Sequence, residues 1–130
     1  MRLLKKLDAN DPSAFYALGR CYNHTLRYTQ ASEILSQLVA LMPDHALGHY
    51  QLGFALLQQF SKRSEAIAHF MRAIEICPHI TKAYFFLSWA LVRMERDLPR
   101  AKRLLDEIKE FRPNEARQLA NLMSLNEPNN

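Results

Sequence analysis

A repeat of about 35 residues runs through this 130-residue chain. Three of its prolines are spaced 35 residues apart, and a set of small residues and leucines recurs with them at intervals of 34 or 35. These markers are Pro43, Pro78 and Pro113; Ala31, Ala66 and Ala101; Gly19, Gly53 and Ser88; and Leu18, Leu52 and Leu87. Self-similarity at one period is the signature of repeat architectures. The sequence therefore predicts stacked copies of one small unit.

Within each unit the apolar residues recur at helical spacing, in two separate stretches. The second stretch of the middle unit has a stripe at intervals of three and four residues, formed by Ala66, Ile67, Phe70, Ala73 and Ile74. The connecting residues 59–64 have the polar composition of a turn. Proline ends the second helix because it cannot donate to the hydrogen-bond ladder. Each unit is predicted to be helix, short turn, helix.

The recurring small residues have a steric purpose. Gly19, Gly53 and Ser88 fall where the first helix of each unit crosses closest to the second. Small side chains there let two backbones approach, whereas a bulky residue would push the helices apart. One such hairpin cannot bury its apolar face alone, so the units are expected to stack.

The pattern resembles the tetratricopeptide repeat, a helix–turn–helix unit of 34 residues with the signature W-x2-L-G-x2-Y, then A-x3-F, then P. The matching residues are Phe15, Leu18, Gly19, Tyr22, Ala31, Leu35 and Pro43 in the first unit; His49, Leu52, Gly53, Leu56, Ala66, Phe70 and Pro78 in the second; and Tyr84, Leu87, Ser88, Leu91, Ala101, Leu105 and Pro113 in the third. The second and third units have one extra residue, assigned to the turn before Ala66 and Ala101. The resemblance implies an all-α, right-handed α-solenoid.

The repeat boundaries divide the chain into five segments. Units are expected at 12–45, 46–80 and 81–115, and residues 116–130 are expected to form a capping helix, with Asn114 as its N-cap, and a frayed tail. Residues 1–11 are interpreted as the end of a preceding helix or as an N-terminal cap. The first interpretation makes the chain a fragment of a longer protein, and the second does not.

Nothing in the sequence supports catalysis, a metal site or a cofactor. Among the five histidines, His45 and His49 are four residues apart, but His45 falls in the loop after Pro43 and no Glu follows it as in zinc proteases. Three glycines are too few for a phosphate-binding loop. Cys21 and Cys77 are too few for a disulfide framework and are interpreted as reduced, buried residues. The net charge of +4 is too small to indicate nucleic-acid binding by itself. A cytoplasmic location is expected, and a signal upstream of Met1 would overturn it.

The resemblance implies that the first helices line a concave face that holds a peptide. Transferred to this sequence, the groove residues are Tyr16, Arg20, Tyr50, Phe54, Leu57, Lys82, Phe85, Trp89 and Arg93. Large apolar residues in such a face favour a partner. Some relatives clamp acidic peptide tails with five polar residues. Only Lys82 matches that clamp, because the other positions hold Tyr16, Arg20, Gln51 and Phe86. The hypothesis is a non-catalytic protein–protein interaction module of scaffold, adaptor or co-chaperone type.

Two other functions stay open. The same apolar surface, or the leucines at 3, 4 and 7, would serve a self-association module, with a second copy of the chain as partner. A weak nucleic-acid contact would use the basic residues of the third unit, although acidic neighbours dilute their charge. These basic residues are Arg93, Arg96, Arg100, Lys102 and Arg103.

Overall fold

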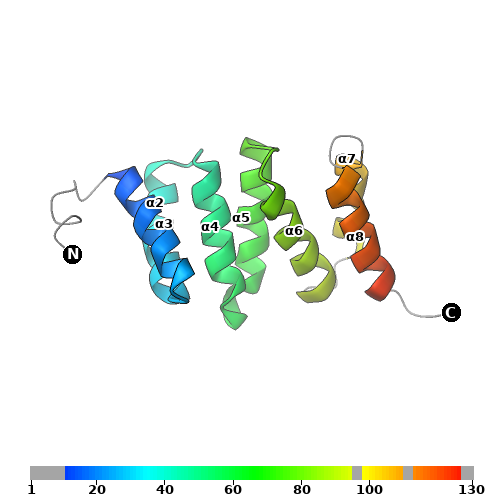
Figure 1. Cartoon of the computed structure of the whole chain (residues 1–130), viewed down its shortest axis with the longest axis horizontal. Helices are drawn as coiled ribbons and strands as arrows, with labels where there is room; N and C mark the ends of the chain where they lie inside the picture. Colours follow the sequence, from blue (N-terminus) through cyan, green and yellow to red (C-terminus); the bar gives the residue numbers. More distant parts are fainter. Residues whose placement is uncertain (1–10, 95–97, 110–112, 127–130) are drawn as a thin grey trace.

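The computed structural model describes residues 11–94, 98–109 and 113–126, and these residues form helices joined by short turns, with no strand among them. The elements are α2 (Pro12–His24), α3 (Tyr28–Leu41), α4 (Ala46–Leu57), the 3-10 turn η1 (Phe60–Lys62), α5 (Arg63–Ile76), α6 (Thr81–Trp89), the π-helical turn η2 (Ala90–Met94), α7 (Leu98–Ile108) and α8 (Pro113–Asn126). Successive helices run in opposite directions and lie in a row (Figure 1). This arrangement is an all-α, repeat-type solenoid, as the sequence predicts.

The glycines at the helix crossings face large side chains of the neighbouring helix. A Cβ atom added to Gly53 would lie 2.9 Å from Cε1 of Phe70, and one added to Gly19 would collide with the side chain of Leu35. Phe70 and Leu35 are fully buried and occupy the large position of the repeat signature. The glycines therefore make room for the large side chain of the second helix.

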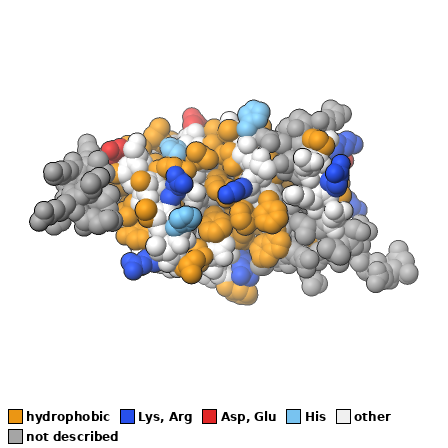
Figure 2. Space-filling view, viewed as in Figure 1, with side chains coloured by type: hydrophobic (Ala, Val, Ile, Leu, Met, Phe, Trp, Pro, Cys, Tyr) orange, Lys and Arg blue, Asp and Glu red, His pale blue; other side chains and the backbone are white. Residues whose placement is uncertain are grey.

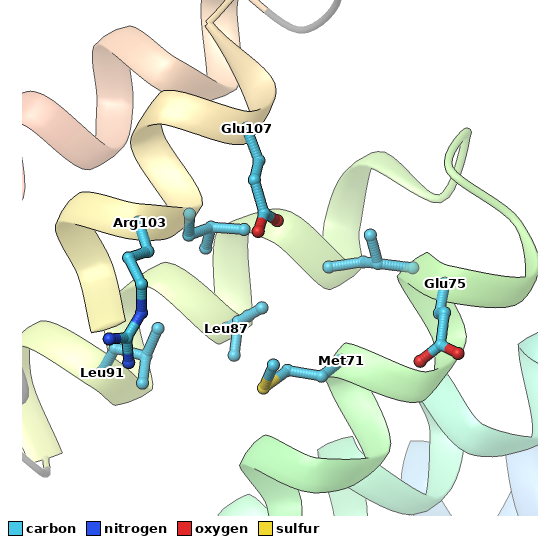
Figure 3. Close-up of a pocket in the computed structure, with 8 residues that line it drawn as sticks. Met71, Glu75, Leu87, Leu91, Arg103 and Glu107 are labelled. Carbon is cyan, nitrogen blue, oxygen red and sulfur yellow. The ribbon is translucent and has the colours of Figure 1, made fainter. Parts of the chain in front are cut away.

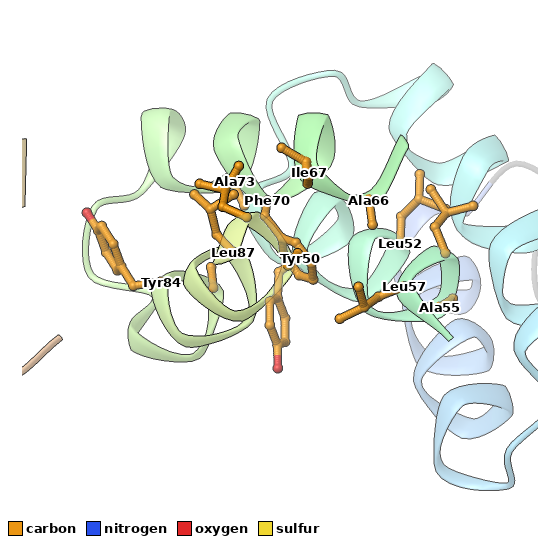
Figure 4. Close-up of a cluster of buried hydrophobic side chains, with 14 of the residues drawn as sticks. Tyr50, Leu52, Ala55, Leu57, Ala66, Ile67, Phe70, Ala73, Tyr84 and Leu87 are labelled. Carbon is orange, nitrogen blue, oxygen red and sulfur yellow. The ribbon is translucent and has the colours of Figure 1, made fainter. Parts of the chain in front are cut away.

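The hydrophobic core is a continuous band along the row of helices (Figure 4). Its fully buried large side chains come from α3, α4, α5, α6 and the π-helical turn η2. They are Tyr84, Phe70, Leu35, Leu38, Leu52, Leu87, Leu91 and Val92. Each helix pair therefore buries its apolar face against the next pair, as repeat stacking requires.

Several helix ends differ from the sequence prediction. The turn expected at 59–64 is shorter, because Phe60–Lys62 forms a 3-10 turn and α5 begins at Arg63. In the third unit α7 ends at Ile108, and Pro113 is the first residue of α8. Proline suits a first helical position, where its missing N–H has no intrahelical partner. The prediction of Asn114 as N-cap is therefore wrong.

The π-helical turn η2 was not predicted. It continues α6 directly from Trp89 into Ala90–Met94. A π-turn takes up one residue more than an α-turn over the same length of helix. The extra residue of the third unit can therefore lie within the helix. The sequence analysis had assigned it to the turn that follows.

The cysteines are both free, as expected. Cys21 is exposed and Cys77 half-buried, so the prediction that both are buried is wrong.

In the part of the chain that the structure describes, no helix has the length and hydrophobicity that a membrane span requires.

The end of α2 places a leucine in a conformation that normally belongs to glycine. Leu26 has φ 62°, its N–H donates to the carbonyl of Asn23 at 3.2 Å, and the N–H of Arg27 donates to the carbonyl of Tyr22 at 2.8 Å. These two hydrogen bonds form a Schellman motif at the end of the helix. The residue with positive φ in this motif is usually glycine, because a Cβ atom there has a steric cost.

We expect Leu26→Gly to raise the free energy of unfolding by about 1 kcal/mol, because it removes that penalty. Urea unfolding measures the change. Leu26→Ala is the control, since it keeps the Cβ and should gain nothing; equal stabilities of the two variants would contradict the assignment of strain.

Candidate peptide-binding groove

The first helix of each predicted unit positions the expected groove residues. α2 contributes Tyr16 and Arg20, α4 contributes Tyr50, Phe54 and Leu57, and α6 contributes Lys82, Phe85 and Trp89. The backbone of Arg93 lies in η2, and its side chain is outside the described residues. On the face seen in Figure 2, hydrophobic side chains gather between α4 and α6, with Lys and Arg side chains among them.

Aromatic rings of α4, α5 and α6 form one cluster around Phe86. The Phe86 ring centroid lies 5.3 Å from that of Phe54, 5.1 Å from Phe85, 6.1 Å from Phe70 and 6.3 Å from Tyr50. The contacts with Phe54 and Phe85 are edge-to-face, a favourable arrangement of aromatic pairs. The structure thus brings Tyr50, Phe54 and Phe85 together through a residue that was not predicted for the groove.

Beside this cluster lies a small apolar pocket of about 170 Å³ between α4 and α6. It is lined by Leu57, Gln58, Arg63, Phe85, Phe86 and Trp89. The side chain of Leu57 is only 3% exposed and forms part of the floor, whereas Phe85 is 45% exposed. Three expected groove residues therefore meet around one depression, and Phe85 is the most accessible of them.

Tyr50 is more deeply placed than a groove-lining residue. It is 9% exposed, and its ring centroid lies 6.1 Å from that of Phe70 in the core. Burial, with a smaller contribution from Tyr16, raises the pKa of its phenol above the ordinary value. The phenol therefore stays neutral at physiological pH, and Tyr50 supports the groove from below.

Two of the expected groove residues, Arg20 and Lys82, are cations. The guanidinium carbon of Arg20 lies 5.6 Å from the ring centroid of Tyr16 on the same helix, and Lys82 is exposed. At a position of the acidic-tail clamp, Gln51 is already engaged: its side-chain oxygen accepts from Nδ2 of Asn23 at 2.9 Å. The described residues therefore present a mainly aromatic site, with Arg63 among the residues that line its pocket.

A comparison with protein families identifies the first pair of helices. Residues 13–45, which contain α2 and α3, match the model of the tetratricopeptide repeat. This match and the row of paired helices support a tetratricopeptide-like repeat protein. The match spans the first predicted unit, and the number of repeats stays a prediction. No curated protein matches the chain. The family assignment supports a protein–protein interaction or scaffold module.

This tetratricopeptide-like protein has a second, larger pocket, of about 330 Å³, between the second helices α5 and α7 (Figure 3). Its floor is apolar, and its rim carries charged side chains of both signs. The lining residues are Met71, Ile74, Glu75, Leu87, Leu91, Arg103, Leu104 and Glu107. Sequence reasoning missed it because the second helices were expected only to pack. It is the alternative candidate site to the groove between α4 and α6.

Two histidines join α4 to α5. Nε2 of His49 lies 2.8 Å from the carbonyl oxygen of Pro43, so Nε2 carries the proton. Nδ1 of His49 then accepts from Nδ1–H of His69, at 3.1 Å. Burial, and next the neighbouring His49, lower the pKa of His69, while Glu65 acts in the opposite direction. No group of three metal-ligating side chains is found within the described ranges.

The lowered pKa of His69 predicts a pH-dependent stability. Between the folded-state pKa and the unfolded value of about 6.5, the unfolded chain binds more protons than the folded chain. The free energy of unfolding should therefore decrease as the pH falls through about 6.5, and level off below the folded-state pKa. Urea unfolding between neutral and acidic pH measures this slope. His69→Gln should flatten it, whereas replacing the exposed His24 should not; a His69→Gln slope equal to the parent's would contradict the prediction.

Proposed function

We propose that this protein is a non-catalytic interaction module that binds a peptide or helix of a partner between α4 and α6. The observation that carries the proposal is the exposed Phe85 beside a pocket floored by Leu57 and flanked by Trp89. Aromatic side chains in a desolvated depression are the usual energetic centres of protein interfaces. An apolar side chain of the partner fills the pocket, and Arg20 and Lys82 interact with its polar flanks.

The groove is suited to an apolar anchor more than to an acidic tail. Phe86 and Gln51 occupy two positions of the acidic-tail clamp, and both are engaged inside the protein, by ring contacts and by Asn23 respectively. The expected groove cations Arg20 and Lys82 are exposed, and exposed charges contribute more to the rate of encounter than to affinity. Recognition therefore depends on shape and apolar area.

A photo-crosslinking amino acid placed at Phe85 tests the proposal, because this side chain is accessible whereas Tyr50 is buried. We expect a crosslinked partner peptide with a large apolar residue at the contact. The same group placed at Met71, 44% exposed beside the alternative candidate site, is the control. Crosslinking of the same peptide through Met71 and not through Phe85 would refute the proposed site.

The other two functions make different predictions. Self-association through the apolar face would appear as a concentration-dependent mass in analytical ultracentrifugation. Nucleic-acid binding through α7 would weaken steeply with salt, because phosphate contacts release counterions. Lys102 and Arg103 are exposed on α7, but so are Asp106 and Glu107 on the same helix. That mixed charge favours the protein partner.

A further inference from the structure

The two most exposed large apolar side chains of the described residues occupy equivalent places in the fold. Phe60 is 84% exposed and Leu26 is 71% exposed. Leu26 lies in the turn between α2 and α3, and Phe60 in the turn between α4 and α5. Both turns are at the same end of the molecule (Figure 1). The second turn also contacts the start of α3, because Nε2 of Gln59 donates to the carbonyl of Tyr28 at 3.2 Å and to Oγ of Ser32 at 3.1 Å.

Each apolar tip is followed by a cation at the start of a helix. Arg27 occupies the N-cap position of α3 and Lys62 that of α5, and neither helix start has a side-chain cap. The N-terminus of a helix carries a partial positive charge, so it favours an anion, and a cation placed there is unfavourable alone. The acidic residue in the first turn of α5 is Glu65, and α3 has none.

Arg63 adds to this arrangement. Its guanidinium carbon lies 5.0 Å from the ring centroid of Phe60, and its Nε donates to the carbonyl of Leu57 at 3.1 Å. The stacked guanidinium and the hydrogen bond hold a cation beside the exposed ring. Leu26, Arg27, Phe60, Lys62 and Arg63 form what we call the turn edge, with two apolar tips among three cations.

We propose that the turn edge docks on an anionic phospholipid membrane surface. Leu26 and Phe60 insert at the level of the headgroups, and Arg27 and Lys62 bind lipid phosphates. Apolar side chains flanked by Lys and Arg are the combination that binds such surfaces. The strained backbone of Leu26 fits this role, because a glycine would relieve the strain but remove the tip.

The chemistry favours lipid over the other anionic or apolar partners. A second copy of the chain would bring three cations against three cations, which repel. A nucleic acid would supply phosphates, but the aliphatic Leu26 has no ring on which a base can stack. Two projecting apolar tips suit a surface that they can penetrate. This docking does not depend on the peptide-binding groove, so each proposal can fail without the other.

Co-sedimentation of the full chain with vesicles tests the proposal. We expect binding to phosphatidylcholine vesicles that contain about one third phosphatidylserine, no binding to phosphatidylcholine alone, and weaker binding as salt increases. Phe60→Ser and Leu26→Gly should each weaken vesicle binding by about tenfold. Because Leu26→Gly should also stabilise the fold, its loss of binding cannot be ascribed to unfolding. Met42→Ser is the matched control: Met42 is 43% exposed, in the connection between α3 and α4, and should not matter.

Three results would overturn the proposal. The first is no binding to the anionic vesicles. The second is binding that neither Phe60→Ser nor Leu26→Gly changes. The third is tight, tip-dependent binding of a single-stranded RNA oligonucleotide without vesicle binding, which would assign the turn edge to nucleic acid.

Discussion

Gly53→Leu should lower the free energy of unfolding by about 3 kcal/mol. The structure leaves no room for a side chain at this crossing, because an added Cβ alone would lie 2.9 Å from Phe70. Phe70 is fully buried and packs against Tyr50 and Phe86, so it cannot move aside without opening the core. Thermal and urea unfolding of the two proteins measure the loss.

The control for this substitution is Ser88→Ala at the corresponding position of α6. Ser88 is buried, and its hydroxyl donates at 2.6 Å to the carbonyl of Tyr84 in its own helix. Alanine leaves that carbonyl its backbone partner, so the stability should stay within about 0.5 kcal/mol of the parent. If Gly53→Leu were as stable as Ser88→Ala, the close helix crossing would be refuted.

The sequence predicts most of the fold because its recurring residues have steric reasons. Gly53 must be small to admit Phe70, and Ala66 is fully buried on the facing helix. The parts of the fold that were not predicted lie where no residue recurs from one unit to the next. Leu26 has a positive φ, which the sequence would have predicted only if the residue were glycine. The π-turn after Trp89 has no sequence signature.

The candidate site is less predictable, because a repeat pattern identifies a helix face but not what covers it. Tyr50 was expected in the groove, yet it is buried against the rings of Phe70 and Phe86. Leu57 is buried as well, but it lines the pocket. Phe86 was considered only as a departure from the acidic-tail clamp, so its place at the centre of the aromatic cluster was not predicted. The one available signal was the local density of aromatic residues in α6.

We expect partner affinity to depend on Phe85 and Trp89 far more than on Arg20 or Lys82. Truncating an aromatic anchor in an interface commonly costs about 2 kcal/mol or more, which is about thirtyfold in affinity. Lys82→Ala should cost less, because Lys82 is exposed. Titration of a crosslinked and then synthesised partner peptide measures these differences. Circular dichroism must confirm an unchanged helix content, above all for Trp89→Ala, because Trp89 also packs against the core.

The most direct test of the peptide-binding groove is a titration of that peptide against two matched variants, Phe85→Ala and Met71→Ala. Phe85 is 45% exposed beside the pocket between α4 and α6, and Met71 is 44% exposed beside the pocket between α5 and α7. We predict that Phe85→Ala weakens binding by about thirtyfold while Met71→Ala stays within about twofold of the parent. A loss of affinity in Met71→Ala with parent-like binding in Phe85→Ala would contradict the account and place the partner between the second helices.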